Sequence, residues 1–164
     1  EYSAPIKLNY TKTDLRNLIY DAWSQANVET NSNDVSLVVN TGTESATAEV
    51  DPFLITNVFR NILQNSLDAR TTGLVVTVRC QEEEIDGSPG IKVIFQDNGP
   101  GIPPEVAMQA FDAFFTTKTR GTGLGLSIVK RYVSSHGGTV QIDSLEPGTQ
   151  ICISLPVTQE HSGE

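Results

Sequence analysis

Two glycine-rich turns at 97–102 (DNGPGI) and 121–126 (GTGLGL) constrain this chain more than any other feature. Glycine adopts positive φ and lets other groups approach the backbone closely. The second turn runs into LSIVKRYVSS, whose apolar spacing predicts a helix. A helix that begins after such a turn offers free N–H groups and a positive dipole end to an anion. Either turn alone is compatible with an ordinary loop, but the pair indicates a phosphate site, with Asp97 available to recognise a base.

The charge distribution supports an anionic ligand. The net charge of −9 argues against general nucleic-acid binding, which needs a basic face. However, no Asp or Glu occurs from Ala113 to Ile142, where Lys118, Arg120, Lys130 and Arg131 fall. We therefore expect a polyanionic ligand near the glycine turns and no nucleic-acid partner.

A helix over 51–69 carries a second candidate element of the site. Asp51 is a good N-cap, and Pro52 suits the first helical position. Residues spaced by threes and fours form its buried face: Leu54, Ile55, Val58, Phe59, Ile62, Leu63 and Leu67. A polar stripe lies beside it: Asn57, Asn61, Asn65 and Asp68. Each asparagine costs the helix roughly 0.5–0.7 kcal/mol relative to alanine. Neutral drift explains one such residue, whereas a stripe predicts amide oxygens facing Mg²⁺ that is shared with a triphosphate.

Asp97 directly follows the strand-like run 90–96. A carboxylate there accepts a hydrogen bond from an exocyclic amine such as adenine N6, whereas guanine presents a carbonyl and would be rejected. Ile102 and its apolar neighbours would line one side of a flat pocket the size of a base. Residues 111–120 show no clean period and carry three phenylalanines, which indicates a loop that closes over the ligand.

The rest of the pattern predicts alternating helices and strands. In chain order we expect a helix over 15–26 capped by Asp14, a hairpin of strands 35–40 and 47–50, strands 74–81 and 90–96 joined by a solvated acidic loop, a short helix over 103–109, a helix from Gly123 or Gly125 ended by Gly137-Gly138, and a hairpin of 139–144 with 149–157. His136 is expected at a solvent-facing helix end. Cys80 and Cys152 are expected as buried free thiols, and a disulfide stays open.

The length suits a single domain. We expect an incoming linker at 1–12, the domain at 13–157 and a tail at 158–164. No run approaches the ~18 apolar residues of a membrane span, and the first residues lack the layout of a signal peptide. We therefore expect no membrane contact by this domain.

Four ordered motifs resemble the catalytic, ATP-binding domain of two-component sensor histidine kinases, in the superfamily shared with gyrase B, MutL-type mismatch-repair ATPases and heat-shock chaperones of that fold. They are NVFRNILQNSLDA at 57–69 (N box), DNGPGI at 97–102 (G1 box), FDAFFTTK at 111–118 (F box) and GTGLGL at 121–126 (G2 box). Gly148-Thr149 resembles the final GT element. The sequence FFTTK and the DA that ends the N box most resemble those of the nitrogen- and oxygen-sensing branch of these kinases.

The resemblance implies a two-layer α/β sandwich, the Bergerat fold, with a mixed sheet of about five strands, three helices on one face and an ATP lid. It implies that Asn65 coordinates Mg²⁺ with help from Asn61, and that Asp97 binds adenine N6 with Thr149 nearby. The other candidate nucleotide-binding residues are Asp68, Gly99, Gly101, Ile102, Lys118, Arg120, Gly121, Thr122, Gly123, Leu124 and Gly125. Of these, Lys118 and Arg120 are the catalytic candidates, because they would meet the β- and γ-phosphates from the lid.

The chain departs from the family pattern in three places. Asp68-Ala69 stands where many kinases carry Lys or Arg and then an aromatic residue, so phosphate charge would be met elsewhere, for example by Arg70. Ala113 replaces the usual F-box proline. Asn61 occupies the position of the water-activating glutamate of the hydrolysing relatives, and an amide cannot act as a base. We therefore expect ATP to be held and presented with little hydrolysis.

The sequence thus favours transfer of the γ-phosphoryl group of Mg-ATP to a histidine on a separate dimerisation domain, which would precede residue 1. A response regulator would act downstream, and the domain would work in the cytoplasm, whether or not its parent is membrane-anchored. Two alternatives stay open. One is an ATPase driven by lid closure, against which Asn61 speaks, and the other is a non-catalytic nucleotide-binding regulator.

Overall fold

The main layer of the protein is a mixed five-stranded sheet, in the order β2-β4-β5-β7-β6. The structure is a computed structural model that describes residues 5–27, 34–41, 45–68, 72–112, 125–145 and 147–160. The strands are β2 (Val35–Thr41), β4 (Leu74–Ile85), β5 (Ser88–Asp97), β6 (Thr139–Ser144) and β7 (Thr149–Pro156). β2 pairs with β4 in parallel, whereas the other neighbours are antiparallel. The expected mixed sheet of about five strands is confirmed.

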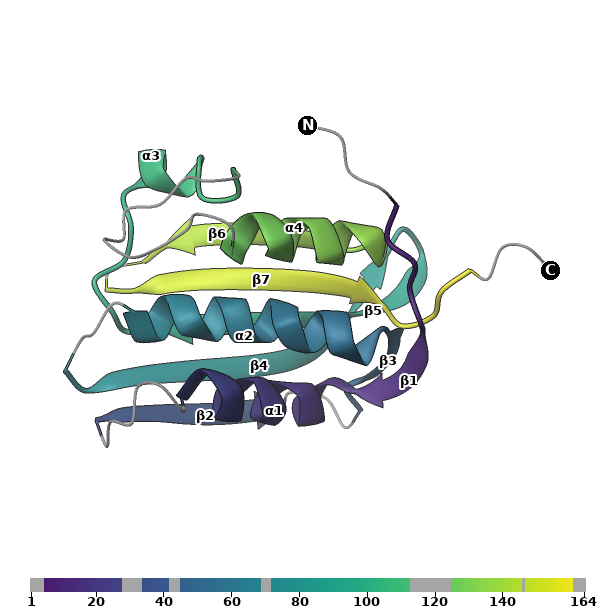
Figure 1. Cartoon of the computed structure of the whole chain (residues 1–164), viewed down its shortest axis with the longest axis horizontal. Helices are drawn as coiled ribbons and strands as arrows, with labels where there is room; N and C mark the ends of the chain where they lie inside the picture. The colour runs from purple at the N-terminus through teal and green to yellow at the C-terminus, as the bar shows by residue number, and fades with distance from the viewer. Residues whose placement is uncertain are drawn as a thin grey trace.

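Three helices cover one face of this sheet (Figure 1). They are α1 (Leu15–Asn27), α2 (Pro52–Asp68) and α4 (Gly125–Ser135), whereas the four-residue α3 (Pro104–Ala107) lies beyond the edge strand β6. Alternate residues of the central strands are buried against the helices, as the period of a half-covered sheet requires. Phe59 of α2 and Phe95 of β5 pack with ring centroids 5.3 Å apart. The predicted two-layer sandwich is therefore confirmed.

A small second sheet corrects the predicted hairpin of 35–40 with 47–50. β3 (Thr47–Val50) pairs antiparallel with β1 (Thr11–Asp14), and β2 instead pairs with β4. Strands close in sequence suggested a hairpin, but the pairing was decided by partners distant in the chain. β1 begins within the range 1–12 that the sequence suggests as a linker, and the limits of the domain stay a prediction.

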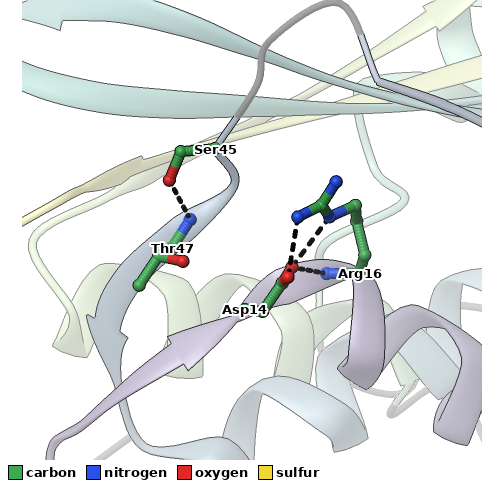
Figure 2. A network of polar contacts seen from close by, with 4 residues as sticks. All are labelled: Asp14, Arg16, Ser45 and Thr47. Atoms are coloured by element: carbon green, nitrogen blue, oxygen red, sulfur yellow. Dashed lines mark hydrogen bonds and ion pairs between the residues drawn. The ribbon is translucent and has the colours of Figure 1, made fainter.

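The predicted cap of the first helix is present. Asp14 ends β1, and its Oδ1 accepts a hydrogen bond from the backbone N of Arg16 at 3.0 Å (Figure 2). The guanidinium of Arg16 also donates to both carboxylate oxygens, at 2.9 and 2.7 Å. The hydrogen bonding of the Arg16 side chain to this carboxylate lowers the pKa of Asp14. Ser45 Oγ accepts from Thr47 N at the start of β3, beside the same junction.

The segment between β4 and β5 is a tight hairpin, not the expected solvated loop. β4 continues through the glutamates to Ile85, and β5 begins at Ser88. Asp86 and Gly87, at φ 51° and 82°, form the two-residue turn with both φ values positive that suits hairpins. An Asp-Gly pair is the usual sequence signal for such a turn, and the run of glutamates obscured it.

His136 is fully buried, so its predicted solvent-facing position is wrong. Its Nε2 accepts a hydrogen bond from the backbone N of Asp51 at 3.0 Å, and its Nδ1 donates to the carbonyl of Tyr132 at 2.7 Å. These two partners require the neutral ring, with its proton on Nδ1. Burial lowers the pKa of His136, which favours the same neutral form.

The two cysteines are free, as expected. Cys80 is buried, which raises its pKa to about 11, and Cys152 is half-buried. Within the described ranges, no helix combines the length and apolarity needed to cross a bilayer.

Candidate functional site

The end of β5, the start of β7 and the end of α2 lie at the same end of the sheet (Figure 1), and they bring several predicted site residues together. β5 ends at Asp97 and β7 begins at Thr149, and these two residues are partners across the strands. The last turn of α2 reaches the same place, because Ser66 Oγ donates a hydrogen bond to Asp97 Oδ2 at 2.6 Å. Strand ends and a helix end that are far apart in the chain therefore surround one carboxylate.

The carboxylate of Asp97 is held by three donors. Its Oδ1 accepts from the backbone N of Gly99 at 3.0 Å and from that of Thr149 at 3.2 Å, and its Oδ2 accepts from Ser66. An ionised carboxylate accepts about four hydrogen bonds, two at each oxygen. Among the described residues no other donor is bonded to it, so one acceptor position is left, on Oδ2. The half-buried group can therefore take one donor from a ligand, such as an amino group.

The turn that follows Asp97 is fixed to its neighbours by Asn98. The side-chain Oδ1 of Asn98 accepts from Val75 N at 2.8 Å, and its Nδ2 donates to the carbonyl of Gly73 at 3.1 Å. The backbone N of Asn98 donates to the carbonyl of Val75 at 3.3 Å. Asn98 thus anchors the turn to the start of β4 and leaves Asp97 in a defined position.

Two glycines let this turn pack against the turn between β6 and β7. Gly101 has φ +79°, and a Cβ there would lie 2.8 Å from the carbonyl oxygen of Gly148. Gly148 has φ +108°, and a Cβ there would overlap the carbonyl oxygen of Asp97. Ser144 Oγ donates to the carbonyl of Ile102, which joins the same two turns. Both glycines are required by close backbone approach as well as by their φ.

The polar stripe of α2 faces the beginning of α4. A Cβ on Gly125, the first residue of α4, would lie 3.6 Å from Asn61 Oδ1. Asn61 therefore lies beside the N-terminal end of α4, where the helix dipole is positive. Asn65 is half-buried one turn further along α2. Asp68 is exposed, and its Oδ1 accepts from Gln64 Nε2 at 2.8 Å.

The lid part of the predicted site lies outside the described residues. This part comprises Lys118, Arg120, Gly121, Thr122, Gly123 and Leu124. The structure therefore brings together Asp97, Gly99, Gly101 and Thr149, with Ile102 beside them, and it places Asn61 against Gly125. The roles of all these residues stay predictions.

A surface depression of about 340 Å³ lies elsewhere, between α3 and β6. Its lining contains none of the predicted site residues: Pro104, Ala107, Met108, Ile142, Asp143 and Ser144. The candidate site is therefore defined by the hydrogen bonds around Asp97 and not by this depression. Sequence reasoning did not identify Ser66 as part of the site. Its only local signals are its position next to Asn65 and the modest helix propensity of serine.

Residues 50–159 match the family model described as "Histidine kinase-, DNA gyrase B-, and HSP90-like ATPase". Because the match covers more than half of the chain, the chain belongs to this family. The family expected from the four motifs is thereby confirmed, and nucleotide use is the property that its description names.

Curated relatives and solved structures agree with this assignment. Sensor histidine kinase ZraS of Escherichia coli K12 is 32% identical over 158 residues, covering 96% of this chain and 33% of ZraS. Sensory histidine kinase/phosphatase NtrB of Azospirillum brasilense is 35% identical over 114 residues, covering 63% of this chain and 28% of NtrB. The chain thus spans about a third of the length of these two relatives.

Solved histidine kinase structures share the fold, and two of them are 28% identical to this chain. The catalytic domain of histidine kinase ThkA superposes with a TM-score of 0.80 at 28% identity, covering 92% of this chain and 97% of that domain. The mycobacterial sensor histidine kinase MprB superposes with a TM-score of 0.78 at 28% identity, covering 93% and 100%. The fold predicted from the sequence is therefore that of histidine kinase catalytic domains.

Proposed function

We propose that this chain is the part of a sensor histidine kinase that binds Mg-ATP and presents its γ-phosphoryl group to a histidine on a separate dimerisation domain. The observation that carries the proposal is the carboxylate of Asp97, which three donors hold so that one acceptor position is left. The family and its sensor-kinase relatives support the reaction class.

In this proposal, Asp97 recognises the base. Its remaining acceptor position on Oδ2 takes a hydrogen bond from the 6-amino group of adenine. The corresponding group of guanine is a carbonyl, so two acceptors would face each other in a half-buried site. The paired turns that contain Gly101 and Gly148 would support the base, with Ile102 alongside. The site would therefore select ATP over GTP.

The phosphate end of the site would be formed by α2 and α4. Asn65 and Asn61 would hold Mg²⁺, and their neutral amide oxygens fit an ion that phosphates already share, because added carboxylates would repel those phosphates. The bound ion would neutralise phosphate charge. The N–H groups at the start of α4 would receive phosphate oxygens, and Lys118 and Arg120 would complete the neutralisation.

The reaction would then be transfer and not hydrolysis. The bond between the γ-phosphorus and its bridging oxygen breaks, a P–N bond to the imidazole forms, and ADP leaves. Catalysis of this kind depends mainly on positioning and charge neutralisation. Asn61 stands beside the phosphate end and cannot accept a proton from water, which would keep ATP intact until the histidine arrives.

The proposed partners are a histidine-bearing dimerisation domain and a response regulator. Histidine kinase ThkA, which resembles this chain with a TM-score of 0.75 at 25% identity, has been solved in complex with the response regulator protein TrrA. That complex supports a response regulator as the downstream partner here. We place the domain in the cytoplasm, where its nucleotide is supplied.

The proposal is tested by removing the two central side chains. Asp97→Ala and Asn65→Ala should each weaken Mg-ATP binding by more than about 100-fold, because one removes the base acceptor and the other a metal ligand. Titration calorimetry measures the affinity, and circular dichroism checks folding. Gln96→Ala, at an exposed position next to Asp97, is the matched control and should bind normally.

Labelled ATP then tests the reaction class. Incubation with an added histidine-bearing dimerisation domain should label that domain. If both Asp97→Ala and Asn65→Ala still bound Mg-ATP with micromolar affinity, the proposed nucleotide site would be rejected. Steady ATP turnover without transfer would point to an ATPase, and binding without transfer to any cognate domain would point to a nucleotide-binding regulator.

A further inference from the structure

We propose that Ser66 is a positioning residue that holds the Asp97 carboxylate in the orientation that recognises an amino-bearing purine. This inference rests on the proposed function. It assigns a specificity role to a residue of the N box that the sequence did not single out as a ligand. Its basis is the hydrogen bond of 2.6 Å from Ser66 Oγ to Asp97 Oδ2, between a helix and a strand end 31 residues away.

The contact is not the default behaviour of a serine in a helix. Such hydroxyls commonly donate to the carbonyl four residues earlier in the same helix. Ser135 in α4 does this, with its Oγ 2.9 Å from the carbonyl of Arg131. Ser66 instead gives its single proton to a carboxylate in the neighbouring layer, where a charge-assisted O–H···O⁻ bond is short and strong. The hydroxyl is therefore committed to Asp97.

Ser66 also limits the direction from which Asp97 can accept a hydrogen bond from a ligand. Both backbone donors, from Gly99 and Thr149, bond to Oδ1 and fill its two acceptor positions. These donors leave Oδ2 with two positions, and Ser66 occupies one of them. A single direction is then left for the amino group of the base. Without Ser66, both positions on Oδ2 would take water that the nucleotide must displace or reorganise.

The role is tested by a thermodynamic cycle that removes the Ser66 hydroxyl and the 6-amino group of the base separately and together. The chain and its Ser66→Ala variant are titrated with Mg-ATP and with the Mg²⁺ complex of purine riboside triphosphate, which lacks the 6-amino group. Alanine favours helices, so the variant is expected to fold. Ser66→Ala should weaken ATP binding about five- to tenfold, as expected for one lost hydrogen bond to a charged group. Binding of the analogue should change less than about twofold.

Two further variants complete the test. Ser66→Thr keeps the hydroxyl and should restore most of the ATP affinity. Ser134→Ala removes an exposed serine of α4 and should change neither affinity. Equal weakening of both nucleotides by Ser66→Ala, or no weakening of ATP binding, would overturn this role and leave the proposed function standing. Failure of the unaltered chain to bind ATP would overturn both.

Discussion

The two ends of the helical layer differ in how their polar groups are satisfied. At the end with His136, buried polar groups bond to one another. His136 is 0% exposed and Asp51 is 5% exposed. Both ring nitrogens of His136 have partners, and the two carboxylate oxygens of Asp51 accept from Asn9 N and Leu54 N. This end thereby joins the incoming chain, the start of α2 and the end of α4.

At the other end, the same helix α2 meets a carboxylate that is only half-buried. Asp97 has three donors and one acceptor position left. Filling both positions of the His136 ring stabilises the structure, because a buried polar group without a partner is costly. Among the described residues, Asp51 accepts one hydrogen bond at each oxygen, but it is 5% exposed, so burial closes its carboxylate to a ligand. Leaving one position on an otherwise fixed group prepares it for a ligand. The difference suggests that one end of the layer serves stability and the other serves recognition.

The largest effect expected on stability comes from Gly148. In Gly148→Ala, the strained φ and the overlap of the new Cβ with the carbonyl of Asp97 should together lower the free energy of unfolding by more than about 3 kcal/mol. Residual folded protein should have lost ATP affinity. Urea denaturation and calorimetry measure the two effects.

Gly73→Ala is the matched control for this change. Gly73 has a similar positive φ of +71°, but nothing lies within 4 Å of its Cβ position. It should cost only about 1 kcal/mol, from the backbone conformation alone. If the two variants were equally stable, close approach to Asp97 would not be the constraint at Gly148.

His136→Ala should be the next largest change. The backbone N–H of Asp51 would lose its acceptor and a cavity would form, so the free energy of unfolding should fall by roughly 2–3 kcal/mol. ATP affinity of the folded protein should stay within about twofold of the original if the two ends are independent. Ser134→Ala, at an exposed position two residues away, should shift stability by less than about 0.5 kcal/mol. A tenfold loss of ATP affinity in His136→Ala would show that the ends are coupled.

The smallest effect is a dependence of stability on pH. Burial lowers the pKa of His136 in the fold below its ordinary value of 6.5. As pH falls through this value, the unfolded chain takes up a proton that the folded chain does not. The stabilisation is therefore complete above about pH 6.5 and is lost towards the lowered pKa, by at most about 1.4 kcal/mol per pH unit.

Urea midpoints at pH 7.5 and 5.5 measure this loss. The difference should be smaller in His136→Ala, and His161, present in both proteins, cancels in the comparison. Titration of Asp14, whose pKa is also lowered, contributes only at more acidic pH. An identical pH slope in the two proteins would contradict the neutral, buried state of His136.

Local patterns in the sequence predicted much of the fold. The cap at Asp51 and the apolar period specified α2, which runs from Pro52 to Asp68 as expected within a residue. The strand at 139–144 was predicted with its observed limits. Each of these features depends on neighbours within one or two turns. Such signals are readable because capping and amphipathic period are properties of the chain itself.

Most of the errors have a different cause. The partner of β3, the burial of His136 and the bond from Ser66 to Asp97 all depend on residues far away in the chain. The sequence of a strand does not show which other strand it will pair with. A histidine just before a glycine at the end of a helix has the same local pattern whether it is exposed or buried. The Asp86-Gly87 turn was a readable local signal that the surrounding glutamates obscured.

The sequence by itself determined the family, most of the elements and the chemical types at the site, because motif residues and hydrophobic periods are contained in short stretches of the chain. The tertiary structure alone decided that Asp97 has one acceptor position left and that His136 has none to offer. Hydrogen-bond donors and acceptors are counted in space, so only the packed arrangement of α2, α4 and the strand ends shows which of them a ligand can still use.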